Sequence, residues 1–430
     1  MRYKPIPSEM YINNRARLTA KMKPGSIAIV NANDEMPRTG DQTFGYRQNS
    51  DLFYLTGLDQ EKCILVLCPG HPLESMREIL FTVKTSDLMV TWNGYKYTFD
   101  EVRKLSGIKT VKWIDDFDFI LKELMSHVQT VYLNQNEYIK FFTDVPYRDL
   151  RFAEKMRREF PVHTYERLAP LITSMRTAKQ PGELEQIKKA CDITGDAFRR
   201  VLRFVKPGMM EYQVEAEMIH EFISRGCNGH SFSPIIASGK NSCILHYVNN
   251  DLPCKDGDVL LLDFGAEYGL YGADMTRTIP VNGKFSPRQR QVYEAVLRVL
   301  KAGMTMLTPG NTNDNWHKAM CSLIEKELVG LGLITEDDIK NQDPDNPAFF
   351  RYYMHGSGHF LGLDVHDVGT KQQPFEYGAV MTCEPGIYIP EEGIGIRLEN
   401  DVIVADKPIN LMENIPVEPD EIEAIMLSGK

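Results

Sequence analysis

The stretch GDVLLLDFGAEYGLYGADMTRTIPV, residues 257–281, predicts a buried β-hairpin that also carries acidic side chains. Its apolar run VLLL is bounded by turn residues, which is typical of a buried strand, and the run ends at Asp263. After a glycine-punctuated turn, Asp274 opens a second strand, in which Asp274, Thr276 and Thr278 share one face. Either the two aspartates meet across the hairpin, or they cap turns at its edge. A carboxylate at the end of a buried strand is costly unless it is paired or bound to a metal.

A similar arrangement recurs in AVMTCEPGIYIPEEGIGIRLENDVIV, residues 379–404. Glu384 ends an apolar strand that Pro385 and Gly386 then break. The return strand GIRLENDVIV alternates in polarity, so that Arg397 and Glu399 lie on one face of it. An Arg near a Glu usually means a plain ion pair, and that interpretation stays open for this strand.

The segment HGSGHFLGLDVHD, residues 355–367, holds three of the chain's 10 histidines. The spacing of His355 and His359 is that of the zinc-binding helix H-E-x-x-H, but no Glu follows the first His. Gly356 and Gly358 also argue against a helix. The alternative is a glycine-rich turn whose histidines only bond the backbone. Together with the two hairpins, however, the segment offers five or six candidate ligands.

Carboxylate and imidazole ligands favour divalent Mn, Co, Zn or Fe over soft metals. Four carboxylates would balance the charge of two such ions, which explains how acidic residues can end buried strands. A pair of metal ions about 3.5–4 Å apart is the usual arrangement for hydrolysis. The sequence therefore predicts a dinuclear hydrolase.

Composition limits the remaining function classes. The chain has 430 residues, 43% of them hydrophobic, and a net charge of -10 without a block of basic residues, which argues against nucleic acid as a partner. The eight cysteines show no C-x-x-C spacing and several lie in apolar runs, which suits buried thiols in a reducing compartment. The N-terminus has no apolar signal region and no run approaches a membrane span, so we expect a soluble, cytoplasmic protein with no membrane partner. The chain contains neither G-x-S-x-G nor a P-loop, which disfavours a serine hydrolase or a nucleotide-binding protein.

Two domains are expected, residues 1–170 and residues 171–430, with a Pro- and Gly-containing boundary segment at 166–183. The first domain has a mixed α/β pattern, with strands predicted at 26–32, 63–68, 78–83 and 130–134 and a helix at 117–128.

In the second domain, apolar residues recur every three or four positions from Glu183, which predicts a long amphipathic helix. Further helices are expected at 211–225, after the cap Ser286-Pro287, and at about 312–329. The order of helix pair, strands, helix pair and strands hints at an internal duplication.

These motifs resemble those of aminopeptidase P, the Xaa-Pro aminopeptidases among the "pita-bread" metallopeptidases, a class that includes prolidase and methionine aminopeptidase. The resemblance covers nearly the whole chain and includes YRQNSDLFYLTG at 46–57, a signature of the family's N-terminal domain. It implies an α/β two-domain fold, in which the N-terminal mixed α/β domain precedes a pita-bread catalytic domain of pseudo-duplicated helix pairs on a curved sheet. The implied activity is hydrolysis of the N-terminal Xaa-Pro bond of peptides by a hydroxide that bridges two metal ions, with Mn2+ expected first and Co2+ or Zn2+ as alternatives.

The resemblance also implies roles for individual residues, with Asp274 and Glu399 bridging both ions. Glu384 would act as general base as well as ligand. His366 would contact the substrate, and His246 would steady the peptide carbonyl or shuttle protons. Tyr388 and Arg397 would orient the ligands, while His355 matches a motif position of less defined role. The implied ligands are Asp263, Asp274, His359, Glu384 and Glu399.

Two departures from the family pattern concern substrate length. Gly358 stands where aminopeptidase P often has Ser, and Asn400 is seen in the dipeptidase branch, whereas the N-terminal signature favours aminopeptidase P. Prolidase, restricted to Xaa-Pro dipeptides, is therefore the alternative, and a non-catalytic binding protein on the same fold is a remote one. The family also implies a homodimer or homotetramer, in which Trp92 is a candidate contact to a neighbouring active site.

Overall fold

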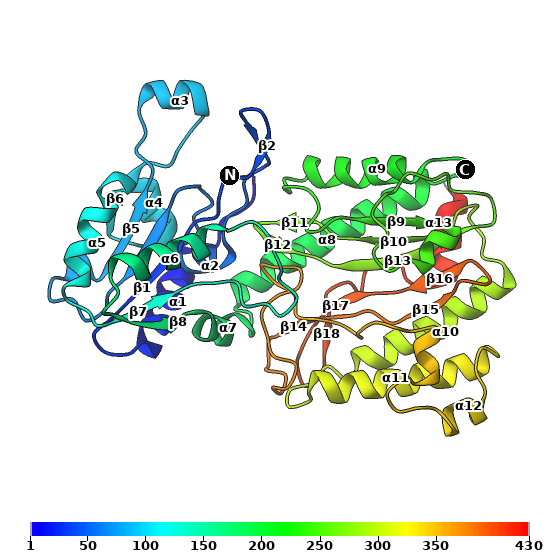
Figure 1. The fold of residues 1–430 in the computed structure, drawn as a ribbon. Coiled ribbons are helices and arrows are strands. Elements are labelled where there is room, and N and C mark those ends of the chain that lie inside the picture. Colours follow the sequence, from blue (N-terminus) through cyan, green and yellow to red (C-terminus); the bar gives the residue numbers. More distant parts are fainter. Residues whose placement is uncertain (1, 429–430) are drawn as a thin grey trace. The chain divides into compact units, whose positions relative to one another are not determined.

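The computed structural model describes residues 2–428, and the chain divides into two compact units (Figure 1). One unit spans Lys4–Arg176, and the other contains Thr177 to the end of the described chain together with Arg2 and Tyr3. The change from one unit to the other falls within the segment 166–183 noted in the sequence. The assignment of residues 1–170 and 171–430 to two domains stays a prediction.

The N-terminal unit is built on a six-stranded sheet with the order β6-β5-β4-β1-β7-β8. β1 is parallel to β7, β7 to β8 and β5 to β6, whereas β4 is antiparallel to both β1 and β5. Five strands therefore run in one direction and end at the same edge. The strands are β1 (Ser26–Asn31), β4 (Ile64–Leu67), β5 (Glu78–Thr82), β6 (Thr110–Trp113), β7 (Thr130–Leu133) and β8 (Thr164–Arg167).

Helices α5 (Phe117–Met125) and α6 (Arg148–Glu159) contribute side chains to one apolar core together with alternate residues of these strands, such as Ile27 and Ile29. β1 is buried along its whole length, so both faces of the sheet are covered at its centre. All four strands predicted in this unit are confirmed. β6 and β8 were missed because their sequences, TVKW and TYER, are partly exposed and have no apolar run. The other helices are α1 (Ser8–Lys21), α2 (Ser50–Thr56), α3 (Asp87–Asn93), α4 (Phe99–Ser106) and α7 (Ala169–Arg176), and a short exposed hairpin is formed by β2 (Pro37–Thr39) and β3 (Gln42–Thr43).

The C-terminal unit repeats the order of helix pair followed by strands, as predicted (Figure 1). At the start of the second pair, the Ser286 hydroxyl accepts a hydrogen bond from the Gln289 backbone, and the Gln289 side chain accepts one from the Ser286 backbone. This is the predicted capping box. The helix pairs are α8 (Pro181–Phe204) with α9 (Glu211–Ser224), and α10 (Pro287–Met304) with α11 (Asn313–Gly330); α12 (Glu336–Lys340) and α13 (Pro419–Ser428) follow.

Each helix pair is followed by a nested hairpin, in which an outer pair of antiparallel strands encloses an inner antiparallel pair. The first has β10 (Val259–Phe264) and β13 (Met275–Pro280) outside β11 (Glu267–Tyr268) and β12 (Tyr271–Gly272). The second has β14 (Val380–Cys383) and β17 (Asn400–Ile403) outside β15 (Gly386–Ile389) and β16 (Ile394–Arg397). β13 contacts both β16 and β17, so the two nested hairpins adjoin. Strands β9 (Ile235–Ser238) and β18 (Ile409–Asn410) extend the two outer pairs.

The return strand predicted across GIRLENDVIV is wrong in one respect. The structure breaks it at Leu398 and Glu399 into β16 and β17, which pair with different partners. The polarity of the stretch alternates through the break, so the sequence pattern gives no sign of it. The break places Glu399 immediately before β17, as Asp274 lies immediately before β13.

A buried ion pair joins the start of this unit to the histidine-bearing segment. Lys179 Nζ lies 2.8 Å from Asp367 Oδ2, and both side chains are only 1% exposed. Removing one partner of a buried pair leaves an uncompensated charge and costs about 3–5 kcal/mol.

We therefore expect Lys179→Met to lower the free energy of unfolding by about 3–5 kcal/mol, measured by urea denaturation. Lys188→Met is the matched control, because Lys188 forms an exposed i,i+4 pair with Asp192, and such pairs contribute about 0.3–0.5 kcal/mol. Equal losses in the two variants would contradict the importance of the buried pair.

Candidate active site

The nested hairpins bring the predicted acidic residues together at their inner edges. Asp263 is the second-to-last residue of β10 and is opposite Thr276 in the register of β10 with β13. Asp274 comes directly before β13, Glu384 directly after β14, and Glu399 directly before β17. The backbone N–H of Glu399 donates to the carbonyl oxygen of Thr276 (3.0 Å), which ties the second hairpin to the first at this point.

The imidazole of His359 completes this cluster. Its Nε2 lies 3.3 Å from Asp274 Oδ2 and 4.0 Å from Glu384 Oε1. One ligand atom each of Asp274, His359 and Glu399 lie within 4.8 Å of one another. The backbone N–H of His359 donates to the Thr382 hydroxyl (3.0 Å), which attaches the glycine-rich segment to β14. The segment is therefore not a helix, as its glycines predicted.

The carboxylates of the cluster disfavour one another's ionisation. Burial, followed by the negative charge of Asp263, raises the pKa of Asp274 well above its ordinary value. Burial and then the charge of Asp274 have the same effect on the pKa of Glu399. The Oδ1 atoms of Asp263 and Asp274 are buried and have no hydrogen-bond partner among residues 2–428. Buried carboxylate oxygens in this state fit cation ligands, because a cation both neutralises and coordinates them.

Arg397 is the cationic side chain that the structure places against this cluster. Its Nη2 donates to Asp263 Oδ2 (2.6 Å), its Nη1 to the Tyr388 hydroxyl (2.9 Å) and its Nε to Thr276 Oγ1 (3.2 Å). Thr276 Oγ1 donates in turn to Glu399 Oε2 (2.7 Å). The plain ion pair considered for Arg397 thus exists, but with Asp263.

His355 is held as a neutral imidazole. Its Nε2 is 2.8 Å from the Tyr388 hydroxyl, and its Nδ1 is 2.8 Å from the Gly356 carbonyl oxygen and 3.7 Å from Glu384 Oε2. Burial, with the positive charge of Arg397 as the next cause, lowers the pKa of His355 to about 3.

The two remaining histidines lie at exposed positions beside this core. The ring of His366 meets that of His359 edge-on, with centroids 4.4 Å apart. His246 follows the 3-10 turn Gly239–Cys243 and is near enough to His355 for its charge to contribute to the lowered pKa of His355. The structure thus gathers the residues singled out in the sequence around one cluster.

Sequence reasoning missed several supporting residues. Asp401, fully buried in β17, accepts a hydrogen bond at Oδ2 from the backbone N–H of Asp274 (3.1 Å), and burial raises its pKa to about 7. The Ser357 hydroxyl lies 2.8 Å from both His317 Nδ1 and the Tyr353 hydroxyl. Asp401 lies within the quoted stretch GIRLENDVIV and could have been noticed there as a further acid in an apolar strand. His317 and Tyr353 carry no such signal, because only the tertiary fold brings them to Ser357.

Comparison with known proteins identifies the class first. Residues 185–406 match the model of metallopeptidase family M24, and residues 11–132 match that of the aminopeptidase P N-terminal domain. The chain therefore belongs to metallopeptidase family M24.

Relatives then place it among the Xaa-Pro aminopeptidases. It is 34% identical to the Xaa-Pro aminopeptidase of Escherichia coli strain K12 over 445 residues, covering 99% of each chain. With the Xaa-Pro aminopeptidase of Haemophilus influenzae it shares 32% identity over 434 residues, covering 98% of each. A structure of zinc-substituted E. coli aminopeptidase P in complex with product superposes with a TM-score of 0.88 at 31% identity, covering 99% of this chain and 100% of that one. The resemblance and the two-domain fold predicted from the sequence are confirmed. Within residues 2–428, none of the helices combines the length and apolar character needed to cross a membrane.

We expect Arg397→Lys to impair the centre, because one ammonium group cannot reproduce three directed hydrogen bonds from a planar fork. Loss of a residue that orients ligands typically costs about 10–100-fold in metal affinity or activity. Metal affinity, measured by competition with a chelator, and kcat should both fall. Arg298→Lys, at an exposed pair with Glu327, is the control and should leave both unchanged. An Arg397→Lys enzyme with wild-type metal affinity would contradict the orienting role.

Proposed function

We propose that the chain hydrolyses the bond between the N-terminal residue and a following proline of peptides, using two divalent cations held by five side chains. The observation that carries this proposal is the convergence of buried carboxylates and one imidazole, with ligand atoms of Asp274, His359 and Glu399 within 4.8 Å of one another. The proposed ligands are Asp263, Asp274, His359, Glu384 and Glu399, with Asp274 and Glu399 shared by both cations.

Charge balance supports two cations rather than one. Of the four carboxylates, that of Asp263 is paired with the Arg397 guanidinium, which leaves three. The buried Arg277 guanidinium bonds the carbonyl oxygen of Glu399 rather than a carboxylate of this set. Three negative charges are an excess that one divalent ion would not neutralise. Oxygen and nitrogen donors favour Mn2+ as the native ion, with Co2+ and Zn2+ as alternatives. When bound, such ions polarise the substrate carbonyl and make water a nucleophile near neutral pH.

The surrounding side chains position the substrate and move the proton. Glu384, whose side chain is 21% exposed, is the proposed general base, because it reaches solvent more than the other acids of the cluster. His246 and His366 are the proposed substrate contacts, since both are exposed beside the cluster. Tyr388 and Arg397 hold Asp263 in place, and His355 fixes the Tyr388 hydroxyl.

The proline nitrogen of the scissile bond carries no hydrogen, so its site needs room for the ring and no acceptor awaiting an N–H group. His366 lies beside His359 and is the proposed wall of that site. Longer peptides are the proposed substrates, because the full-length relatives are named Xaa-Pro aminopeptidases.

We also propose a cytoplasmic location and a homodimer or homotetramer. All eight cysteines are free thiols, and each is buried except Cys243, which is half-buried; this supports a reducing compartment. Trp92 on α3 is 80% exposed, which makes it a candidate subunit contact.

Metal content tests the dinuclear centre. We expect elemental analysis to find two divalent ions per chain, and activity lost to a chelator to return best with Mn2+. Asp274→Asn should abolish most activity and lower the ion content, because a neutral amide replaces a shared carboxylate. Asp256→Asn, at an exposed site, should change neither property. Saturation at one ion per chain in the active enzyme would refute the dinuclear proposal.

Substrate length separates the two peptidase readings. We expect Xaa-Pro-Yaa tripeptides to yield free Xaa and Pro-Yaa with higher kcat/KM than the matching Xaa-Pro dipeptides, and Xaa-Ala-Yaa to be poor. Chromatographic separation of the products from Mn2+-loaded enzyme gives the answer. Rapid cleavage of the dipeptides, while the tripeptides stay uncleaved, would instead indicate a prolidase.

A further inference from the structure

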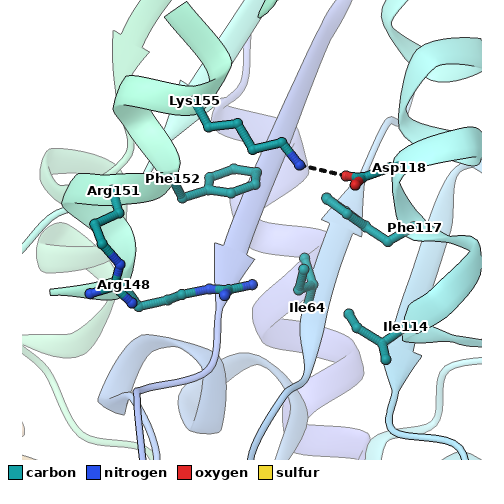
Figure 2. A pocket seen from close by; sticks show the side chains of 8 residues that line it. All are labelled: Ile64, Ile114, Phe117, Asp118, Arg148, Arg151, Phe152 and Lys155. Atoms are coloured by element: carbon teal, nitrogen blue, oxygen red, sulfur yellow. Dashed lines mark hydrogen bonds and ion pairs between the residues drawn. The ribbon is translucent and has the colours of Figure 1, made fainter.

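The N-terminal unit contains a cavity that the peptidase chemistry does not use. Its volume is about 280 Å3, and it lies between α5, α6 and the start of β4 (Figure 2). The lining combines four apolar and four charged residues: Ile64, Ile114, Phe117, Asp118, Arg148, Arg151, Phe152 and Lys155.

The cavity occupies the place in the sheet where α/β folds usually bind ligands. Ile64 begins the antiparallel strand β4 and is opposite Asn31, the last residue of β1. Ile114 directly follows β6, and Arg148 is the first residue of α6. The cavity therefore opens at the carboxyl ends of the five co-directional strands, beside a helix N-terminus. In open α/β sheets, the crevice at this edge is the general ligand position.

Three cationic side chains of the cavity project from one stripe of α6, at positions 148, 151 and 155 (Figure 2). Two of them are already paired, Lys155 with Asp118 (2.6 Å) and Arg151 with Asp34 (2.6 Å). The side chain of Arg148 forms no hydrogen bond or ion pair within residues 2–428, and Figure 2 shows its guanidinium extending into the space in front of Ile64. The cavity thus holds one half-buried guanidinium that bonds no side chain among the described residues, although its charge offsets part of the raised pKa of the adjacent Asp149.

The rest of the lining is apolar. Phe117 and Phe152 belong to the core between the sheet and its helices, and Ile64 is 1% exposed. A ligand here would meet aromatic and aliphatic carbon at one end and a guanidinium at the other. Half of the lining is charged, but Asp118, Arg151 and Lys155 are engaged in ion pairs. Arg148 is therefore the charged group left for a ligand, and one placed polar group beside apolar carbon suits a small-molecule site.

We propose that this cavity binds a small carboxylate that carries an apolar or aromatic body. Arg148 would pair bidentately with the carboxylate, which its planar fork matches, and the body would lie against Phe117, Phe152 and Ile64. One carboxylate balances the one unpaired cation. A doubly charged phosphate would exceed it, because Asp118 and Asp34 already occupy the other two cations.

Calorimetric titration of the metal-loaded, full-length enzyme with phenylacetate tests the site. Arg148→Gln should weaken binding about tenfold or more, the usual effect of removing a charged hydrogen-bond partner. Arg158→Gln is the matched control, because Arg158 lies on the same helix with its side chain 76% exposed. Any phenylacetate that binds at the metal centre contributes equally to the titration of both variants. The difference in affinity between the two variants therefore measures binding in the cavity.

Two analogues separate the parts of the ligand. Benzyl alcohol, which lacks the charge, should show no difference between the two variants. Acetate, which keeps the charge and lacks the ring, should bind the Arg158→Gln enzyme more weakly than phenylacetate does. Identical phenylacetate affinity in Arg148→Gln and Arg158→Gln would overturn the proposal. Benzylphosphonate binding tenfold tighter than phenylacetate in an Arg148-dependent way would overturn the choice of a carboxylate. The proposal is independent of the peptidase activity, which both variants should retain.

Discussion

The gathering of four carboxylates, all buried except that of Glu384, around one imidazole is the constraint on which the C-terminal unit depends. Each buried ion costs several kcal/mol after the protein has relaxed, and like charges at this separation add to that cost. The raised pKa values of Asp274 and Glu399 have the same two causes, burial and neighbouring negative charge. Arg397 offsets part of it by bonding Asp263, and the bound cations of a metallopeptidase would offset the rest. The fold therefore maintains an acidic cluster whose full ionisation is favoured when positive charge is supplied.

The repeated nested hairpin explains how a chain can assemble such a cluster from distant residues. In each hairpin an acidic residue lies between the second inner strand and the second outer strand: Asp274 between β12 and β13, and Glu399 between β16 and β17. The contact between β13 and β17 then brings the two hairpins together. Thr276 joins them further, since its hydroxyl accepts from Arg397 and donates to Glu399. The internal duplication that the element order suggested is thus visible in the topology and in where each half places its acids.

The two units use their sheets differently. The C-terminal unit places its chemistry between adjoining hairpins, where the side chains are buried and directed by hydrogen bonds. The N-terminal unit leaves Arg148 unpaired at the carboxyl edge of a sheet of mostly parallel strands, which is where such sheets bind ligands. A guanidinium without a partner costs little here, because Arg148 is only half-buried, and it remains available for an anion.

The sequence by itself determined the elements whose signals are local. Periodicity located α8, the Ser286 cap located α10, and short apolar runs located β1, β4, β5, β7, β10 and β14, because each depends on neighbours within a few residues. The glycines at 356 and 358 correctly excluded a helix for the histidine-bearing segment. Only the tertiary structure decided which distant residues meet: the break between β16 and β17, the pairing of Arg397 with Asp263 and the hydrogen bond from Asp274 to Asp401. Alternation in a sequence shows which face a residue is on but not which strand lies opposite. Which strands become neighbours is determined by contacts between residues more than a hundred positions apart in the chain, such as that between Asp274 and Asp401.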